Sequence, residues 1–211
     1  MKIYQIRIEL TRFKPMIWRR LLIPSNTLLS DLHKMIQTSM GWTNSHLHQF
    51  IHNKTFYTKK YPEDDTWGEL DNVNYSKIRI SAFLLKEKDK IVYEYDFGDS
   101  WEHNIILEKI FPAEKNMIYP ICLGGDMNCP PEDCGGVWGY SEILEILKNP
   151  KHEEYESYIE WLGGEFDPEY FDKEAVNEML SSTDYGCTFR SSKPFITVFK
   201  ITLNKAYPNL S

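Results

Sequence analysis

The chain has 211 residues, 42% of them hydrophobic, which is enough to bury one core of domain size. Its formal net charge of −7 at pH 7 argues against broad nonspecific binding to nucleic acid or anionic lipid, because such binding needs a basic field. No run approaches the roughly 20 apolar residues that span a bilayer, and residues 1–10 lack the apolar core of a signal peptide. We therefore expect a cytoplasmic protein with no membrane partner, whose four cysteines are reduced thiols or metal ligands rather than disulfides.

The first third of the chain predicts the beginning of a sheet. Residues 2–10 and 17–23 alternate between apolar and polar side chains, which predicts a hairpin. Thr27 is the expected cap of a helix over residues 29–40 that ends at Gly41, and residues 46–52 predict a third strand. The polar, turn-rich stretch 53–76 predicts a long loop. Hairpin, helix and strand in this order are typical of a β-grasp-like unit.

Residues 93–103 hold the densest group of reactive side chains in the chain. Residues 91–97 and 101–110 alternate as two strands, and Gly98 with Asp99 provides the turn between them. This hairpin predicts Asp96, Asp99 and His103 near its tip, although some of them lie on opposite faces of the sheet. Residues 77–85 are ambiguous between a short strand and a helical turn.

The second half of the chain changes its period. Residues 112–139 are rich in proline, glycine and cysteine, which predicts an irregular loop. Apolar residues then recur at helical spacing over 141–148 and 152–162 and again after Asp172, a predicted helix cap. Asp167 followed by Pro168 predicts a further helix start, and residues 195–203 predict a strand.

These patterns predict an α+β protein in which a β-grasp-like mixed sheet carries a C-terminal group of helices packed on it. The predicted organisation is a single domain over 1–182, followed by a C-terminal extension over 183–211. Within the domain, residues 1–111 form the sheet, 112–139 the irregular loop and 140–182 the helices.

Several blocks, taken together and in order, resemble one known family. They are Trp18-Arg19-Arg20, Leu32-His33, Gly41-Trp42, His46-Leu47-His48, residues 95–103, Cys129-Pro130-Pro131-Glu132-Asp133, Gly135-Gly136 and Phe166-Asp167-Pro168. Their sequence resembles the plasmid Ri ORF-three-like family over residues 1 to about 182. The resemblance implies membership of a family whose proteins are mostly uncharacterised. Some members are described as passenger or TnpR-like proteins of insertion elements. The resemblance implies no catalytic residue.

Two sets of residues could hold a metal or perform chemistry. His46, His48, Cys122 and Cys129 are candidate ligands of a divalent metal such as zinc, which accepts imidazole and thiolate donors. The cysteine spacing differs from the paired knuckles of strong zinc motifs, which favours the alternative that these thiols are small apolar fillers of a buried loop. Asp96, Asp99 and His103 are the candidate catalytic residues, and capping of the turn is the alternative role for the two aspartates.

Two functions from different classes remain open. The first is a noncatalytic binding or adaptor protein, associated with mobile genetic elements, that binds a protein or a small molecule. Its candidate binding residues are the basic and aromatic cluster Trp18, Arg19 and Arg20, and the loop carboxylates Glu132 and Asp133. The second is a metal-assisted hydrolase or nuclease-like enzyme that uses Asp96, Asp99 and His103. We favour the binding protein, because no nucleophile and base stand at a known spacing.

Overall fold

One mixed sheet of eight strands organises the protein. The computed structural model describes residues 1–59 and 72–187, and the predicted strand at 195–203 lies outside these residues. The strands are β1 (Lys2–Leu10), β2 (Trp18–Pro24), β3 (His48–His52), β4 (Thr55–Thr58), β5 (Val73–Asn74), β6 (Lys90–Tyr95), β7 (Trp101–Pro112) and β8 (Ile121–Asp126). Their order in the sheet is β5-β4-β3-β6-β7-β1-β2-β8, and of these pairs β4 and β5 alone run parallel.

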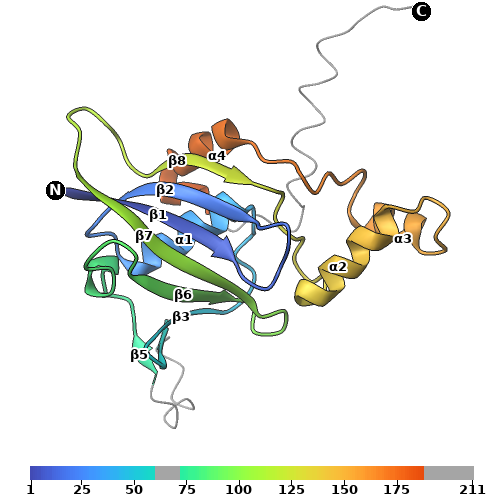
Figure 1. The fold of residues 1–211 in the computed structure, drawn as a ribbon, viewed down its shortest axis with the longest axis horizontal. Helices are drawn as coiled ribbons and strands as arrows, with labels where there is room; N and C mark the ends of the chain where they lie inside the picture. Colours follow the sequence, from blue (N-terminus) through green and yellow to red (C-terminus); the bar gives the residue numbers. More distant parts are fainter. Residues whose placement is uncertain (60–71, 188–211) are drawn as a thin grey trace, which may run out of the picture.

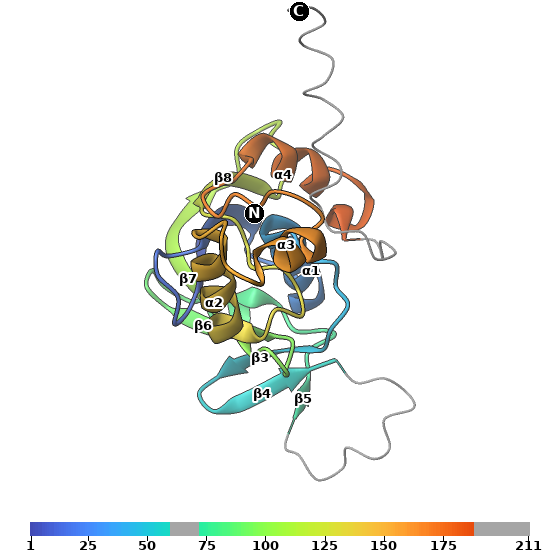
Figure 2. The ribbon, with the colours of Figure 1, turned by 90° about the vertical axis from the view of Figure 1, so that its right-hand side faces the viewer.

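Within residues 1–59 and 72–187, four α-helices and two short 3₁₀ helices accompany the sheet. The α-helices are α1 (Leu29–Met40), α2 (Gly136–Leu147), α3 (Tyr155–Trp161) and α4 (Lys173–Leu180), and the 3₁₀ helices are η2 (Ile80–Ala82) and η3 (Thr183–Gly186). Figure 1 shows α1 against the sheet and α4 beside β8, whereas α2 and α3 lie beyond the end of the sheet. Figure 2 places β8 with α4 at one edge and β4 with β5 at the other. The described helices include none that is both long and apolar enough to cross a membrane.

The alternating sequence of the strands puts one face of the sheet into the core. Ile6 of β1 stands between Leu21 of β2 and Leu107 of β7 in the strand register, and all three side chains are fully buried. The opposite face is polar and carries the ion pair between Arg20 and Glu108. A slip of one residue would turn the buried set outward and bury the charges, so the burial of this face holds the register.

The predicted helix over 29–40 is confirmed, and so is its stop. Gly41 adopts the left-handed conformation with a φ of 98°, and its N–H binds the carbonyl of Gln37. The predicted start is wrong in one respect: the N-cap residue is Leu28. The Thr27 hydroxyl instead donates to the Pro24 carbonyl at 2.7 Å, which closes the turn after β2.

Strands and helices also occupy stretches for which the sequence predicts loops. β4 and β5 lie within the predicted loop 53–76, and β8 together with the first turn of α2 lies within the predicted irregular loop 112–139. β8 contains two glycines and no clear alternation, and its backbone pairing with β2 makes it a strand. Asp167 with Pro168 begins a turn rather than a helix, because the Asp167 carboxylate accepts from the N–H of Glu169.

The chain continues to pack after α4. Thr183–Gly186 forms η3 against α1, where Lys34 pairs with Asp184 and the Thr38 hydroxyl donates to the carbonyl of Tyr185. Cys187 is buried at the end of the described chain. Residues 183–187 are therefore part of the packed protein.

Candidate functional site

The tip of the β6–β7 hairpin is a capped turn. Asp96 follows β6 directly, and its Oδ1 accepts from the N–H of Gly98 at 2.9 Å. This is the turn-capping role that the sequence offers for Asp96. The second oxygen, Oδ2, remains available and faces His46.

The loop before α2 is fixed onto this region by three neighbouring groups. The indole N–H of Trp42 donates to the carbonyl of Pro130 at 3.1 Å, and the hydroxyl of Thr43 donates to Glu132. The Tyr95 hydroxyl donates to Glu132 at 2.5 Å and accepts the backbone N–H groups of Ser45 and His46. Glu132 is thus committed to holding the loop, and Tyr95 connects the loop to the segment that carries His46.

Three glycines let α2 begin directly against the hairpin tip. The N–H of Gly135 donates to Asp99 at 3.2 Å. Gly136 has a φ of 67°, and a Cβ atom there would stand 2.6 Å from the Asp99 carbonyl oxygen. At Gly139 a Cβ atom would stand 1.9 Å from the carbonyl oxygen of Cys134, which no side-chain rotation relieves. The loop can therefore close over the tip only because these residues lack side chains.

We expect Gly139→Ala to destabilise the protein by about 3 kcal/mol, because the new methyl group forces the backbone of the loop away from α2. In an ordinary helix the same change would stabilise the protein by up to about 1 kcal/mol. The sign of the change in stability therefore shows whether the backbone of the loop approaches Gly139 closely. Urea unfolding measures the difference. Gly124→Ala is the control, since its Cβ atom would meet nothing closer than 4.0 Å and should change stability by less than about 0.5 kcal/mol. Equal stability of both variants would contradict the close approach.

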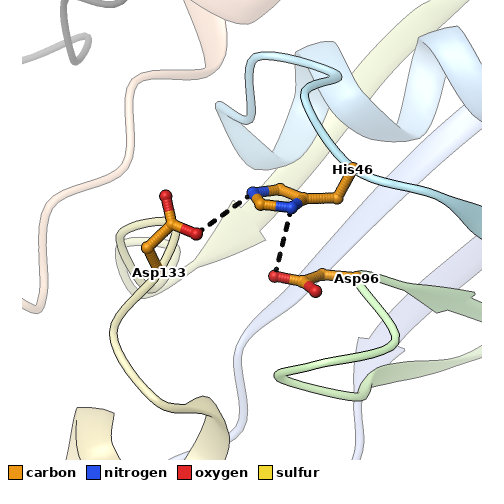
Figure 3. Close-up of side chains that lie close together, drawn as sticks. All are labelled: His46, Asp96 and Asp133. Atoms are coloured by element: carbon orange, nitrogen blue, oxygen red, sulfur yellow. Dashed lines mark ion pairs between the residues drawn. The ribbon is translucent and has the colours of Figure 1, made fainter.

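His46 stands between two carboxylates. Its Nδ1 lies 3.6 Å from Oδ2 of Asp96, and its Nε2 lies 3.4 Å from Oδ1 of Asp133 (Figure 3). Nε2 is buried and has no hydrogen-bond partner among the described residues. Over residues 1–59 and 72–187, these three side chains form the one group of metal-ligand type whose donor atoms lie within 4.8 Å of one another.

A cavity of about 990 Å³ opens beside this group. It lies between the end of α1, the loop before α2 and the region of α3 and α4, and Asp133 belongs to both the cavity and the histidine cluster. Large apolar side chains form much of its wall. They include Trp42, Trp161, Phe166, Phe171, Val176 and Met179.

The charged groups of the cavity are mostly acidic. Five carboxylates line it, from Glu132, Asp133, Glu165, Asp167 and Asp172. Among the described lining residues Arg19 is the single cation, and its side chain is committed elsewhere. The cavity therefore presents negative charge next to apolar surface.

Arg19 forms the base of the cavity. It is 2% exposed, and its guanidinium donates to the backbone carbonyls of Ser39, Trp18, Asp126 and Met127 at 2.8–2.9 Å. Phe171 covers it at 4.2 Å from the ring centroid. Arg19 thereby ties the end of α1 to the end of β8.

The predicted cluster of Trp18, Arg19 and Arg20 does not form a single binding surface. Successive residues of a strand point to opposite faces, so Arg19 enters the core while its neighbours lie on the polar face. There Arg20 pairs with Glu108 at 2.7 Å and also lies over the ring of Trp18.

The predicted metal ligands are likewise separated. His48 stacks on His33 with ring centroids 3.5 Å apart, and its Nε2 lies 2.5 Å from the Tyr75 hydroxyl. Cys122 and Cys129 are buried free thiols, and burial raises the pKa of both. Of His46, His48, Cys122 and Cys129, only His46 belongs to the described metal-type group.

His103 is fully buried on the core face, where its ring lies edge-on to Trp42. Asp96, Asp99 and His103 do not converge as a group of ligands within the described part of the chain. Burial lowers the pKa of His103 to about 3 and that of His33 to about 4. Burial also holds the pKa of His48 well below its ordinary value. All three imidazoles are therefore neutral in the folded protein at neutral pH.

Sequence patterns do not reveal the wall of the cavity. The helical spacing around α3 and α4 identifies apolar residues there, but the same pattern is typical of any helix that packs on a core. Likewise, Asp133 is a candidate binding residue in the sequence, whereas its position beside His46 depends on how the loop closes.

The fold and the site define an α+β protein that has an acidic, aromatic cavity next to a histidine–aspartate cluster. The chain belongs to the plasmid pRiA4b ORF-3-like protein family, whose family model matches residues 2–175. It is 37% identical over 163 residues to the uncharacterized protein y4hQ of Sinorhizobium fredii (strain NBRC 101917 / NGR234), covering 76% of this chain and 81% of that protein. The crystal structure of the protein of unknown function MM3350 from Methanosarcina mazei Go1 is similar, with 41% identity and a TM-score of 0.72. That match covers 82% of this chain and 96% of the other.

Proposed function

We propose that this protein is a noncatalytic binding protein whose cavity receives a segment of a partner protein with basic and apolar side chains. The observation that carries the proposal is the composition of the cavity wall: five carboxylates stand beside large apolar side chains, and the guanidinium of Arg19 is taken up by backbone carbonyls. Such a wall complements a ligand that is both cationic and apolar.

A protein segment fits this surface better than a small molecule does. Trp161 is 45% exposed and Tyr170 is 41% exposed, and both line the cavity. Partly exposed aromatic residues are enriched in the centres of protein interfaces, where they provide much of the binding energy.

Fluorescence anisotropy with two labelled peptides of about twelve residues tests the proposal. Both peptides contain the same leucines and tryptophans, but one also carries lysines and the other glutamates. We expect the lysine peptide to bind at least about tenfold more tightly than the glutamate peptide at low salt, because its charges complement the carboxylates of the cavity. Raising the salt should reduce this difference, since salt screens the carboxylates. Ala175→Trp should weaken this binding by about tenfold, since Ala175 lines the cavity. Ala82→Trp is the control, because Ala82 is exposed and does not line the cavity.

Three outcomes would overturn the proposal. Equal binding of the two peptides would remove the role of the carboxylates, and unchanged binding by Ala175→Trp would place the peptide elsewhere. If octylammonium ion alone bound as tightly as the lysine peptide, the ligand would be a small amine rather than a protein segment.

We further propose a cytoplasmic location and an association with mobile genetic elements. The four free cysteines support the former, and the family description supports the latter. The order β1, β2, α1 and β3 supports our proposal that the sheet is β-grasp-like. The packing of η3 on α1 supports a single domain that extends from the predicted 1–182 as far as Cys187.

A further inference from the structure

Three segments that are distant in the sequence converge beside the cavity. His46 lies between α1 and β3, Asp96 directly follows β6, and Asp133 lies in the loop between β8 and α2. Figure 3 shows the imidazole ring between the two carboxylates, with one ring nitrogen toward each.

The distances in this group are longer than those of ordinary hydrogen bonds. Charge-assisted N–H···O contacts are about 2.7–2.9 Å long, whereas His46 lies 3.6 Å from Asp96 and 3.4 Å from Asp133. Nε2 of His46 is buried and lacks a hydrogen-bond partner in the part of the chain that the structure describes. A buried nitrogen of this kind is costly unless something else binds it.

The spacing instead suits atoms that share a metal ion. Zinc binds imidazole nitrogen and carboxylate oxygen at about 2.0–2.2 Å, so two ligands at tetrahedral angles stand roughly 3.3–3.6 Å apart. The distance of 3.4 Å between Nε2 of His46 and Oδ1 of Asp133 lies in this range. One ion takes only one imidazole nitrogen, whereas the two nitrogens of His46 face different carboxylates. With one donor atom from each residue the group lies within 4.8 Å, so we expect binding to rotate the Asp96 or His46 side chain until all three donors face the ion.

The surrounding structure orients two of the three ligands and leaves the third accessible. Asp96 is held through Oδ1 by the N–H of Gly98, and the backbone of His46 is held by the Tyr95 hydroxyl. Asp133 follows Glu132, which the same hydroxyl holds, and its side chain is 74% exposed. An ion could therefore enter from the solvent side and keep water as a further ligand.

We propose that His46, Asp96 and Asp133 bind one divalent transition-metal ion of the zinc type at the mouth of the cavity. The imidazole selects such an ion over magnesium or calcium, which prefer oxygen ligands alone. The two carboxylates balance its charge. The site shares Asp133 with the cavity, but the ion needs no partner segment in order to bind.

Isothermal titration of zinc chloride into the full chain, after removal of metals with a chelator, tests the site. We expect one zinc ion per chain, no comparable binding of magnesium, and a higher unfolding temperature with zinc than without it. His46→Ala should abolish the binding, and Asp133→Asn should weaken it by about tenfold or more. His152→Ala is the matched control, because His152 lies outside the group and should bind zinc as the parent protein does.

The variants also separate the possible failures. Zinc binding that survives in His46→Ala would place the ion on the cysteines or elsewhere and overturn the proposal, as would the absence of saturable binding in the parent protein. Magnesium binding as strong as that of zinc would overturn the choice of metal. Ala175→Trp should block the peptide and leave zinc binding unchanged, so failure of the metal site and failure of the cavity proposal are distinguishable.

Discussion

Lowering the pH from 7 to 5 is expected to reduce the free energy of unfolding by about 4 kcal/mol through His33 and His103, about 2 kcal/mol for each, and His48 adds to the loss in the same direction. Burial depresses the pKa of His33 to about 4 and that of His103 to about 3, and it depresses the pKa of His48 strongly as well. In the unfolded chain an exposed histidine titrates near 6.5. The unfolded state therefore takes up protons first as the pH falls.

The loss of stability at low pH follows from this difference in histidine pKa between the folded and the unfolded chain. Above about pH 6.5 all three imidazoles are neutral in both states, and their contribution to stability is fully present. Between about pH 6.5 and the folded values near 3–4, protonation favours the unfolded chain and the contribution is lost. A loss of this size is a large share of the stability of a typical domain.

Urea unfolding at pH 7, 6 and 5 measures the effect, and His103→Phe isolates one of its sources. The phenylalanine ring keeps the aromatic contact with Trp42 but cannot take up a proton. The variant should therefore lose about 2 kcal/mol less than the parent protein between pH 7 and 5, whatever its stability at pH 7. A parent protein equally stable at both pH values would show that these histidines are not buried and neutral in solution.

Arg19→Met is expected to destabilise the protein by about 3 kcal/mol or more. The methionine fills part of the space of the side chain, but it leaves the carbonyls of Ser39, Asp126 and Met127 without their donor. A buried polar group that loses its partner costs about 1–3 kcal/mol. Arg19→Lys should recover little of the loss, because one ammonium group cannot reproduce the planar fork that reaches several carbonyls.

Arg20→Met is the matched control for this prediction. Arg20 is the next residue on the same strand, but it lies on the partly exposed polar face, where its pair with Glu108 is worth at most about 1 kcal/mol. Urea unfolding of the two variants should therefore differ by about 2 kcal/mol or more. If both lost the same stability, Arg19 would not be the connection between α1 and β8.

Local patterns were sufficient for the elements whose residues decide their own conformation. The alternation in residues 2–10 and 17–23 predicts β1 and β2, and the apolar spacing before Gly41 predicts α1 and its end. Asp172 caps α4 as predicted, since its carboxylate accepts from the N–H of Ala175. For α1 and α4 the deciding contacts lie within a few residues of one another, and for β1 and β2 the alternation of each strand's own side chains is enough to indicate the element.

The elements that depend on a distant partner were not predictable in this way. β8 is a strand because β2 offers it a free edge, although its own sequence, Ile121–Asp126, contains two glycines and little alternation. The alternation of the predicted strand 17–23 places Arg19 and Arg20 on opposite faces, but the backbone carbonyls that receive the buried guanidinium of Arg19 come from distant segments and are not indicated by the sequence.

The chain by itself thus determines the hairpins, the main helix, the capped turn at Asp96 and the family, because short-range periodicity and turn chemistry encode them. The tertiary structure alone decides that His46, Asp96 and Asp133 meet and that α3 and α4 complete an acidic cavity. The physical reason is that these arrangements depend on closing a long loop over the hairpin tip. Glycines 135, 136 and 139 permit that closure, and hydrogen bonds to Tyr95 and Asp99 hold it.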